Sequence, residues 1–343
     1  IFLYMNSSKG DIISVDILCG LNWGDEAKGK ITGYLLTRNH YDYVCRWAGG
    51  NNAGHTIYVN GEKYKTHLIP CGIFYDVKCV IGPDCVINME GFQQELDYLE
   101  HHGFDISLIK VSPKAHVVMD KHIEEDIMKY SSSQGSTGRG IAPCYKDKYA
   151  RLGTRAGDVE FFAPYLWDEK LSGNILCEGA QGFWLDINYG NYPYVTSSTT
   201  LPYGACVLGF PIQKINRIIG ATKIYDTRSG VDPLFPESLH DNETLAMIGK
   251  VGAEIGVTTG RGRKTNWLNL DKLIVACCVT GVSFVIVSKV DVLISVGVFK
   301  LFYQDALVEF GNIELMKDFI VDKLLERCEY VKTVSFSGSL EGL

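Results

Sequence analysis

The chain has 343 residues, of which 46% are hydrophobic and 21% are charged, and its formal net charge is −7. This composition is that of an ordinary globular protein, so it excludes a disordered or fibrous chain. The acidic balance and the lack of any basic run argue against a general nucleic-acid binder or membrane-surface binder. We therefore expect neither a nucleic-acid partner nor a membrane partner.

Cysteine usage and hydropathy bear on the compartment. The 11 cysteines are scattered without a CxxC pair, which favours reduced thiols over a disulfide framework or a zinc site. The opening residues, "IFLYM", are too few for a signal peptide, and the longest apolar passage, 273–287, is too short to span a bilayer. We expect a soluble, cytoplasmic protein with a single catalytic domain over 11–343 and an N-terminal extension over 1–10.

The first third of the chain alternates strand and helix patterns. "IISVDILCG" (Ile12–Gly20) is typical of a buried strand, and Lys28–Thr37 is typical of the helix that follows it. "TIYVNGEKYKTHLI" predicts a hairpin that turns at Asn60 and Gly61. Helical spacing predicts helices over Met89–His102 and His116–Tyr130, with the strand "ISLIKV" between them.

The remainder of the chain continues the alternation. Ser131–Pro143 is polar and rich in glycine and serine, which predicts a long loop. "NILCEGAQG" and "INRIIGATKIY" predict strands, Asn269–Thr280 a helix before the strand "FVIVSKVD", and Asn312–Cys328 a helix before the strand "YVKTVSFSG". Such alternation predicts an α/β fold with a mostly parallel central sheet flanked by helices.

The stretch "GLNWGDEAKGK" (Gly20–Lys30) connects the first strand to its helix. It meets most of the phosphate-loop template, at Gly24, Gly29 and Lys30. However, Ile31 stands where the template requires a metal-binding Ser or Thr. Asp25 and Glu26 would repel phosphate unless a divalent cation neutralises them or one of them acts as a base. The alternative is a solvated acidic turn without a catalytic role.

Three other loops carry candidate chemistry. "GGNNAGHT" (Gly49–Thr56) places His55 in a glycine-rich loop after a strand, where proton transfer is favoured over a purely structural role. "GSTGRG" (Gly135–Gly140) offers hydroxyls, amides and a guanidinium group to an anion. "TTGRGRK" (Thr258–Lys264) places two hydroxyls beside three cations, a set that suits a carboxylate or phosphate. Taken alone, the latter two also fit a flexible loop and a solvated charged face.

"SKVD" (Ser288–Asp291) ends a strongly apolar strand. It resembles the [NT]KxD element with which GTP-binding proteins read guanine, where the carboxylate accepts two hydrogen bonds from the edge of the base. A match of this length is weak alone, but the end of a strand is the context that the element requires.

The motifs occur in the order found in adenylosuccinate synthetases: "WGDEAKGK", "GGNNAGHT", "HLIPCGI", "STGRGIAP", "EGAQG", "YPYVTSS", "TTGRGRKTNW" and "SKVDVL". The chain therefore resembles that family from about Ile13 onward, in a compact form similar to archaeal and phage-encoded members. The resemblance implies a P-loop-NTPase-like fold with long functional loops. It also implies a homodimeric, Mg²⁺-dependent ligase of purine nucleotide biosynthesis, which joins L-aspartate to IMP at the expense of GTP.

The same resemblance assigns the catalytic residues. Asp25 matches the base that removes the N1 proton of the purine and binds Mg²⁺, and His55 matches the acid at the leaving oxygen of GTP. Lys28 matches the cation that steadies the transferring phosphate, and Gly54 a carbonyl ligand of Mg²⁺. Gln181 matches a purine contact that belongs to the catalytic set. The implied route runs through a 6-phosphoryl purine, from which the amine of aspartate displaces phosphate.

The binding residues follow by the same matching. The purine-nucleotide contacts in addition to Gln181 are Asn52, Thr137, Thr196 and, reaching across from the other subunit, Arg151. The loop that holds aspartate contains Thr258, Thr259, Arg261 and Arg263. The GTP-binding residues are Gly24, Glu26, Gly29, Lys30, Lys289, Asp291 and Gly338.

The chain departs from the usual family pattern in three ways. It is short, with only about twenty residues between Asp158 and "EGAQG". Ala27 replaces the usual glycine of the first loop, a change that a helix-ready backbone tolerates. In "YDTRSGVDPLFPES" (Tyr225–Ser238), where the family has an Arg-Val-Gly-Ala-Gly-Pro-Phe-Pro run, Ser229 and Asp232 introduce polar groups beside the expected ribose pocket. The purine therefore stays open between IMP and dGMP, the substrate of phage relatives that make 2-amino-deoxyadenylosuccinate for the 2-aminoadenine pathway. Many of those relatives lose the base-position Asp, so its retention here favours IMP.

Two functions from other classes compete with the ligase. A GTP-binding switch protein would bind GTP without regard to aspartate, and it leaves His55 and Thr258–Lys264 without roles. A purely structural α/β protein leaves every glycine-rich loop unexplained.

Overall fold

The computed structural model describes residues 11–235, 242–255, 260 and 262–338. Within these ranges, no helix is long and apolar enough to cross a membrane. The expected N-terminal extension over 1–10 lies outside the described residues, as do Thr258, Thr259 and Arg261 of the expected aspartate loop.

A sheet of nine strands forms the centre of the molecule, with the order β15-β12-β9-β1-β8-β2-β5-β6 and with β7 paired to β5. Every pairing within it is parallel. The strands are β1 (Ile12–Gly20), β2 (Tyr43–Gly49), β5 (Lys78–Asn88), β6 (Ile109–Val111), β7 (His116–Val118), β8 (Gly173–Glu178), β9 (Ile215–Lys223), β12 (Phe284–Ser288) and β15 (Thr333–Phe336). The predicted α/β fold with a large parallel sheet is confirmed.

Helices cover both faces of this sheet. The described residues form the helices α1 (Lys28–Arg38), α2 (Met89–His101), α3 (Asp120–Lys129), α4 (Ile141–Ala150), α5 (Glu243–Val251), α6 (Leu270–Thr280), α7 (Val290–Val296) and α8 (Ile313–Arg327), of which α5 packs beside a smaller sheet. Alternate residues of a strand point to opposite faces. Accordingly, Leu18 of β1 shares a buried cluster with Ile31 of α1, whereas the next residue, Cys19, shares one with Leu273 of α6.

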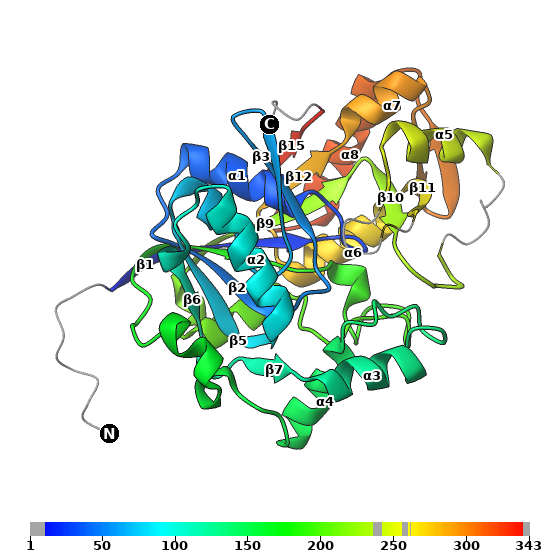
Figure 1. The fold of residues 1–343 in the computed structure, drawn as a ribbon. Coiled ribbons are helices and arrows are strands. Elements are labelled where there is room, and N and C mark those ends of the chain that lie inside the picture. Colours follow the sequence, from blue (N-terminus) through cyan, green and yellow to red (C-terminus); the bar gives the residue numbers. More distant parts are fainter. Residues whose placement is uncertain (1–10, 236–241, 256–259, 261, 339–343) are drawn as a thin grey trace.

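Two small sheets accompany the large one. The predicted hairpin is present as β3 (His55–Val59) and β4 (Glu62–Thr66). A second sheet, which the sequence patterns did not predict, has the order β10-β11-β13-β14. Its strands are β10 (Tyr225–Arg228), β11 (Lys264–Asn269), β13 (Lys300–Tyr303) and β14 (Ala306–Glu309). In Figure 1, α5 lies beside β10 and β11 at the right, and α3 and α4 lie at the bottom.

Several predicted elements are wrong in part. "ISLIKV" is a strand only over Ile109–Val111, and the strand in "FVIVSKVD" ends at Ser288. His116–Tyr130 is not one helix, because His116–Val118 pairs with β5 as strand β7 and the helix begins only at Asp120. The apolar strand pairing overrides the helical spacing. The predicted loop Ser131–Pro143 ends early, since α4 begins at Ile141. "INRIIGATKIY" contains two strands, β9 and β10, which are interrupted at Ile224.

The parallel arrangement determines where the functional loops meet. Because all strands of the large sheet run the same way, their carboxyl ends lie along one edge, where ligands bind in open α/β sheets. The glycine-rich loops after β1, β2 and β8 leave this edge, as do the segments after β12 and β15. The motifs singled out in the sequence therefore converge, although they are far apart along the chain.

Candidate active site

The acidic pair in the loop after β1 is divided between two environments. Glu26 is 1% exposed and turns into its own loop, where Oε1 accepts a hydrogen bond from the N–H of Gly24 at 2.8 Å. Its other oxygen, Oε2, pairs with Nζ of Lys28 at 2.6 Å. Lys28 also donates to the main-chain oxygen of Gln181 at 2.6 Å. The lysine thus joins the phosphate-like loop to the turn after β8, while Glu26 fixes the shape of that loop.

The backbone of this loop is left-handed at three residues, with φ of 86° at Gly24, 63° at Asp25 and 64° at Ala27. The expectation of a helix-ready backbone at Ala27 is wrong, because Ala27 is a left-handed residue immediately before α1. Left-handed geometry costs an L-residue roughly 1–2 kcal/mol. A glycine would carry no such cost, which explains the family's usual residue at this position.

Asp25 lies at the rim of the loop, with its side chain 25% exposed. Its Oδ2 accepts a hydrogen bond from the hydroxyl of Ser229 at 3.2 Å. Nε of Arg263 lies 2.8 Å from the same oxygen. Two of the predicted site residues, Asp25 and Arg263, therefore meet in an ion pair.

Arg263 is also part of a buried charge network that the sequence patterns did not reveal. Its NH1 donates to Oε2 of Glu254 at 2.7 Å, and Nζ of Lys223 donates to the same oxygen at 2.8 Å. Burial favours the neutral acid, yet the charge of Lys223 and the hydrogen bonds from Lys223 and Tyr225 outweigh it and hold the pKa of Glu254 at about 2. Burial opposes the charge of Arg263 as well, but Asp25 and Glu254 raise its pKa. The network anchors Arg263 beside Asp25.

His55 begins β3 and is buried against a second group of charges. Its Nδ1 contacts the carboxylate of Glu178, which ends β8 and also lies 3.3 Å from NH1 of Arg46. Burial lowers the pKa of His55 to about 4, with the cation of Arg46 acting in the same direction and Glu178 opposing both. The imidazole is therefore neutral at pH 7. Because Nδ1 faces Glu178, its proton lies on that side, and Nε2 is the nitrogen left for a ligand.

Gly29 allows the start of α1 to lie close to His55 in β3. A Cβ at Gly29 would lie 2.9 Å from the main-chain oxygen of Thr56 and 3.3 Å from Cβ of His55. Any side chain there would push β3 away from α1, so the close contact between this helix and His55 depends on the glycine.

The ligand atoms of His55, Cys71 and Glu178 lie within 4.8 Å of one another, which makes them a candidate metal centre by distance alone. The donors do not suit Mg²⁺, which takes oxygen ligands. Burial also raises the pKa of the Cys71 thiol well above its ordinary value, so the sulfur stays protonated and is a poor ligand for softer metals. By contrast, Asp25 offers a partly exposed carboxylate at the rim of the first loop.

The expected purine contacts are linked by hydrogen bonds. Oε1 of Gln181 accepts from Ser198 at 2.8 Å, and the hydroxyls of Ser198 and Thr196 lie 3.0 Å apart. Oδ1 of Asn52 is buried without a hydrogen-bond partner among the residues that the structure describes. A buried acceptor of this kind suits a ligand donor. Ser198 was not among the predicted residues, although it belongs to the quoted motif "YPYVTSS".

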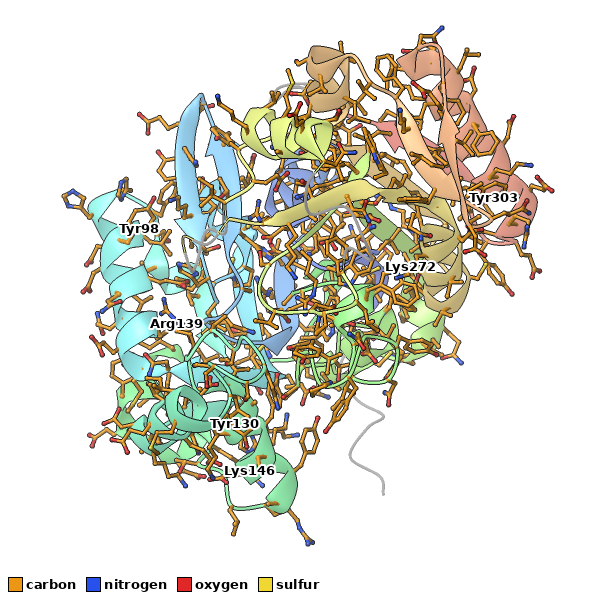
Figure 2. All side chains as sticks on the ribbon, turned by 90° about the vertical axis from the view of Figure 1, so that its right-hand side faces the viewer. Tyr98, Tyr130, Arg139, Lys146, Lys272 and Tyr303 are labelled. Carbon is orange, nitrogen blue, oxygen red and sulfur yellow. The ribbon has the colours of Figure 1, made fainter. Side chains whose placement is uncertain are left out.

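The loop before α4 is held by one buried acid. Asp126 accepts from the hydroxyl of Ser136 at 2.5 Å and from the N–H of Gly140 at 2.8 Å, so the segment containing Thr137 is fixed at both ends. Arg139 leaves the same loop on the side of the molecule that carries Tyr130 and Lys146 (Figure 2).

Arg151 stands apart from the other predicted residues. It is exposed, it caps α4 with a left-handed φ of 65°, and no ion pair of its guanidinium occurs within the described ranges. The structure does not bring it to the other candidates within one protomer.

The expected guanine-reading residues lie together at the carboxyl ends of β12 and β15. A Cβ at Gly338 would lie 3.4 Å from Cβ of Asp291, which is in the first turn of α7. Lys289 precedes that helix with a left-handed φ of 66°, and its Nζ donates to the oxygen of Gly252 at 2.8 Å. Lys30 reaches the same corner, where its Nζ donates to Ser337 at 2.9 Å. The phosphate-like loop and the expected base site are thus neighbours.

Comparisons with known proteins identify the family of this chain. A family model described as adenylosuccinate synthetase matches residues 17–172 and 162–304. The adenylosuccinate synthetase of Shouchella clausii is 38% identical over 342 residues, covering 83% of this chain and 79% of its own. The enzyme of Heliobacterium modesticaldum is 37% identical over 377 residues, covering 92% and 86%.

Solved structures with the same fold include members of this family. A fully ligated adenylosuccinate synthetase from Plasmodium falciparum superposes with a TM-score of 0.79 at 27% identity, covering 96% of this chain and 98% of that one. A succinoaminodeoxyadenylate synthetase of cyanophage S-2L, bound to dGMP and dATP, has a TM-score of 0.73 at 20% identity, covering 95% and 93%. The second likeness concerns the fold alone. The chain belongs to the adenylosuccinate synthetase family of GTP-dependent ligases.

Proposed function

We propose that this protein joins L-aspartate to C6 of IMP, with conversion of GTP to GDP and phosphate, and that Asp25 is its base. The observation that carries the proposal is the contact between Asp25 and Arg263 at the mouth of a phosphate-type loop. Phosphate binding alone requires no carboxylate at the rim of the loop. Removal of the N1 proton from a purine does require a base, and a carboxylate can serve as one. The neighbouring cation suits a second, anionic substrate.

The first step activates the purine oxygen. Asp25 takes the proton from N1, so that negative charge develops on O6, which then attacks the γ-phosphorus of GTP. The bond from that phosphorus to the bridging oxygen breaks, and GDP leaves. Lys28 and the backbone N–H groups of the loop and of the start of α1 stabilise the charge on the transferring group.

His55 supplies the proton at the leaving oxygen. Its imidazole is neutral in the ligand-free protein, with Nδ1 on the Glu178 side. The approach of a polyphosphate adds negative charge near Nε2, which favours the doubly protonated imidazole. Glu178 then balances the imidazolium, as the carboxylate does in other acid-histidine pairs.

The second step forms the C–N bond. The amine of aspartate attacks C6, and O6 leaves with the phosphate group attached. Arg263 supplies a cation for a substrate carboxylate, and it is already anchored by Glu254. We assign Thr258, Thr259 and Arg261 to the same task by family resemblance.

Mg²⁺ fits the residues present. The carboxylate of Asp25 and the main-chain oxygen of Gly54 would hold it, since both offer the oxygen ligands that Mg²⁺ takes. When bound, it supplies positive charge that offsets the repulsion between Asp25 and the phosphates.

We further propose that Lys289, Asp291 and Gly338 select guanine. We also propose that the chain acts as a homodimer, and that residues 11–343 form one catalytic domain that works in the cytoplasm. The exposed position of Arg151 supports a role on the purine phosphate of a partner subunit, because its guanidinium forms no ion pair with the described residues of its own protomer. The short connection between Asp158 and Glu178 supports a compact form of the enzyme.

IMP is the purine that the site favours. Asp25 is retained, whereas many of the phage relatives that use dGMP lose the acid at this position. A dGMP-using variant is the alternative, because the same chemistry at O6 tolerates a 2-amino group and because the segment after β10 departs from the family pattern.

The test is phosphate release from GTP with Mg²⁺ and L-aspartate, run in parallel with IMP, GMP and dGMP, with product formation followed by chromatography. We expect aspartate-dependent release with IMP. Asp25→Asn removes the base and should abolish it, whereas Asp168→Asn, at an exposed position, should not. Release with dGMP but not IMP would favour the 2-amino-deoxyadenylosuccinate variant. No aspartate-dependent release with any purine would refute the ligase.

A further inference from the structure

Ser229 stands where the family pattern has valine, and the mechanism above gives it no role. It is the first residue after β10, and its hydroxyl donates a hydrogen bond to Oδ2 of Asp25 at 3.2 Å. A valine at this position would offer no donor. The departure from the family therefore introduces a new polar contact to the proposed base.

The contact from Ser229 differs in kind from the contact with Arg263. Nε of Arg263 lies 2.8 Å from the same oxygen in an ion pair, but among the described residues its N–H direction does not fit a hydrogen bond. The contact with Arg263 is therefore mainly one of charge. Within the described ranges, Ser229 is the residue that makes a directed hydrogen bond to the Asp25 side chain. A directed bond restricts the orientation of a carboxylate more than a charge contact does.

Arg228 holds the backbone of Ser229 in place. Its NH1 donates to the oxygen of Ser229 at 2.7 Å, its NH2 to the oxygen of Tyr194 at 2.7 Å, and its Nε to Oδ2 of Asp232 at 3.1 Å. Asp232 is 2% exposed and also accepts from Asn191 at 2.7 Å. The second new polar residue of the segment is therefore part of its internal support. It does not add a free polar group to the ribose pocket.

The opposite side of the segment packs against the loop that carries Thr137. A Cβ at Gly135 of that loop would lie 2.7 Å from the backbone nitrogen of Val231, so the two loops are in close contact there. With Arg228 on one side and Gly135 on the other, Ser229 is presented to Asp25 by a packed backbone. Such support is what a positioning residue requires.

We propose that Ser229 is a positioning residue that orients the carboxylate of Asp25 for removal of the N1 proton. This inference rests on the proposed function. The bond from Ser229 engages Oδ2, and we assign removal of the N1 proton to Oδ1. When substrate carboxylates attract Arg263, the hydroxyl keeps Asp25 oriented. Loss of one neutral donor is expected to reduce kcat about five- to tenfold.

The test compares Ser229→Val with Ser229→Thr, because these two side chains have nearly the same shape and differ in the hydroxyl. Ser229→Ala is a third variant without a branched side chain. Aspartate-dependent phosphate release gives kcat and the KM values for purine, GTP and aspartate, and thermal melting checks the fold. Leu234→Ala, a change at an exposed residue of the same segment, is the matched control.

We expect the alanine and valine variants to lose kcat about five- to tenfold with the KM for GTP unchanged, and the threonine variant to stay within about twofold of the parent. An unchanged kcat in the alanine and valine variants would overturn the inference. It would also be overturned if the threonine variant lost as much kcat as the valine variant, or if the KM for the purine rose without a loss of kcat. Activity of the parent protein tests the proposed function separately, since an inactive parent refutes that function and an active parent leaves only Ser229 at stake.

Discussion

Nζ of Lys28 donates a hydrogen bond to the main-chain oxygen of Gln181 at 2.6 Å, and so ties the loop after β1 to the turn after β8. The same ammonium group pairs with Glu26 at 2.6 Å, and both side chains are almost fully buried. One lysine thus has two tasks, which are to hold two catalytic loops together and to present charge to phosphate. Substitutions at Lys28 and Glu26 can distinguish the structural task from the catalytic one.

Lys28→Met should reduce kcat at least about 100-fold and destabilise the protein by about 3 kcal/mol, because it leaves the buried charge of Glu26 without its partner. Adding Glu26→Gln should restore most of the stability and none of the activity. Urea unfolding and phosphate release measure the two effects. Lys146→Met, which breaks an ion pair at the surface, is the control and should leave the stability almost unchanged. If Lys28→Met were equally unstable with and without Glu26→Gln, the loss of stability would not come from the unpaired charge of Glu26.

Ala27→Gly should stabilise the protein by about 0.5–1 kcal/mol, because Ala27 has a left-handed φ of 64° that glycine adopts freely. The gain is smaller than the strain, since glycine also adds freedom to the unfolded chain. Ala246→Gly, at an exposed position of α5, is the matched control and should cost about 1 kcal/mol. Denaturant midpoints measure both changes. Destabilisation by the two substitutions alike would show that Ala27 is not strained.

Glu254→Gln should destabilise the protein at neutral pH by about 3 kcal/mol, because it leaves Lys223 buried without a counter-charge. The wild-type pH profile gives a second signature. The folded-state pKa of Glu254 is about 2, below its ordinary value of 4.5, so its stabilisation is complete above pH 4.5 and is lost as the pH falls toward 2.

The glutamine variant should therefore show a weaker loss of stability between pH 4.5 and 2 than the parent. Unfolding free energies from urea titrations across this window decide the point. Parallel profiles for the two proteins would mean that Glu254 is not held in its charged form.

Glu178→Gln should reduce kcat about 10- to 100-fold with little change in the KM for GTP, because His55 loses the carboxylate that orients its ring. Glu95→Gln is the control for loss of a buried carboxylate outside the site. Glu95 accepts from the backbone N–H groups of His67, Leu68 and Ile69, so its replacement should lower stability and leave the kcat of the folded protein unchanged. If both variants lost kcat to the same extent, His55 would not depend on Glu178.

The sequence was most informative where a loop directly follows a strand. The strand Ile12–Gly20 was predicted with its observed bounds, and the loops after β1, β2 and β12 were located by their glycines and by the apolar runs before them. Parallel strands bring such loops to one edge, so Asp25, His55 and Asp291 could be recognised as candidates without coordinates. Local chemistry and regular topology sufficed for these residues.

The supporting residues were missed for a common physical reason. Glu254, Glu178 and Arg46 act through contacts with residues distant in sequence, and a buried acid or arginine carries no local pattern that reveals its partner. The small sheet containing β10 and β11 was missed likewise, since short antiparallel strands depend on tertiary pairing more than on their own propensity. Ser229 was noticed as a departure, but its contact with Asp25 required the fold.

The central claim is that O6 of the purine attacks GTP and then leaves with the phosphate. The most direct measurement uses IMP labelled with ¹⁸O at position 6, together with GTP, Mg²⁺ and L-aspartate, followed by mass spectrometry of the inorganic phosphate. Transfer through O6 should place one ¹⁸O atom in each phosphate released during formation of adenylosuccinate, and no label should enter phosphate when aspartate is omitted. Unlabelled phosphate released at the same rate as product would contradict a 6-phosphoryl intermediate and the role of Asp25 as its base.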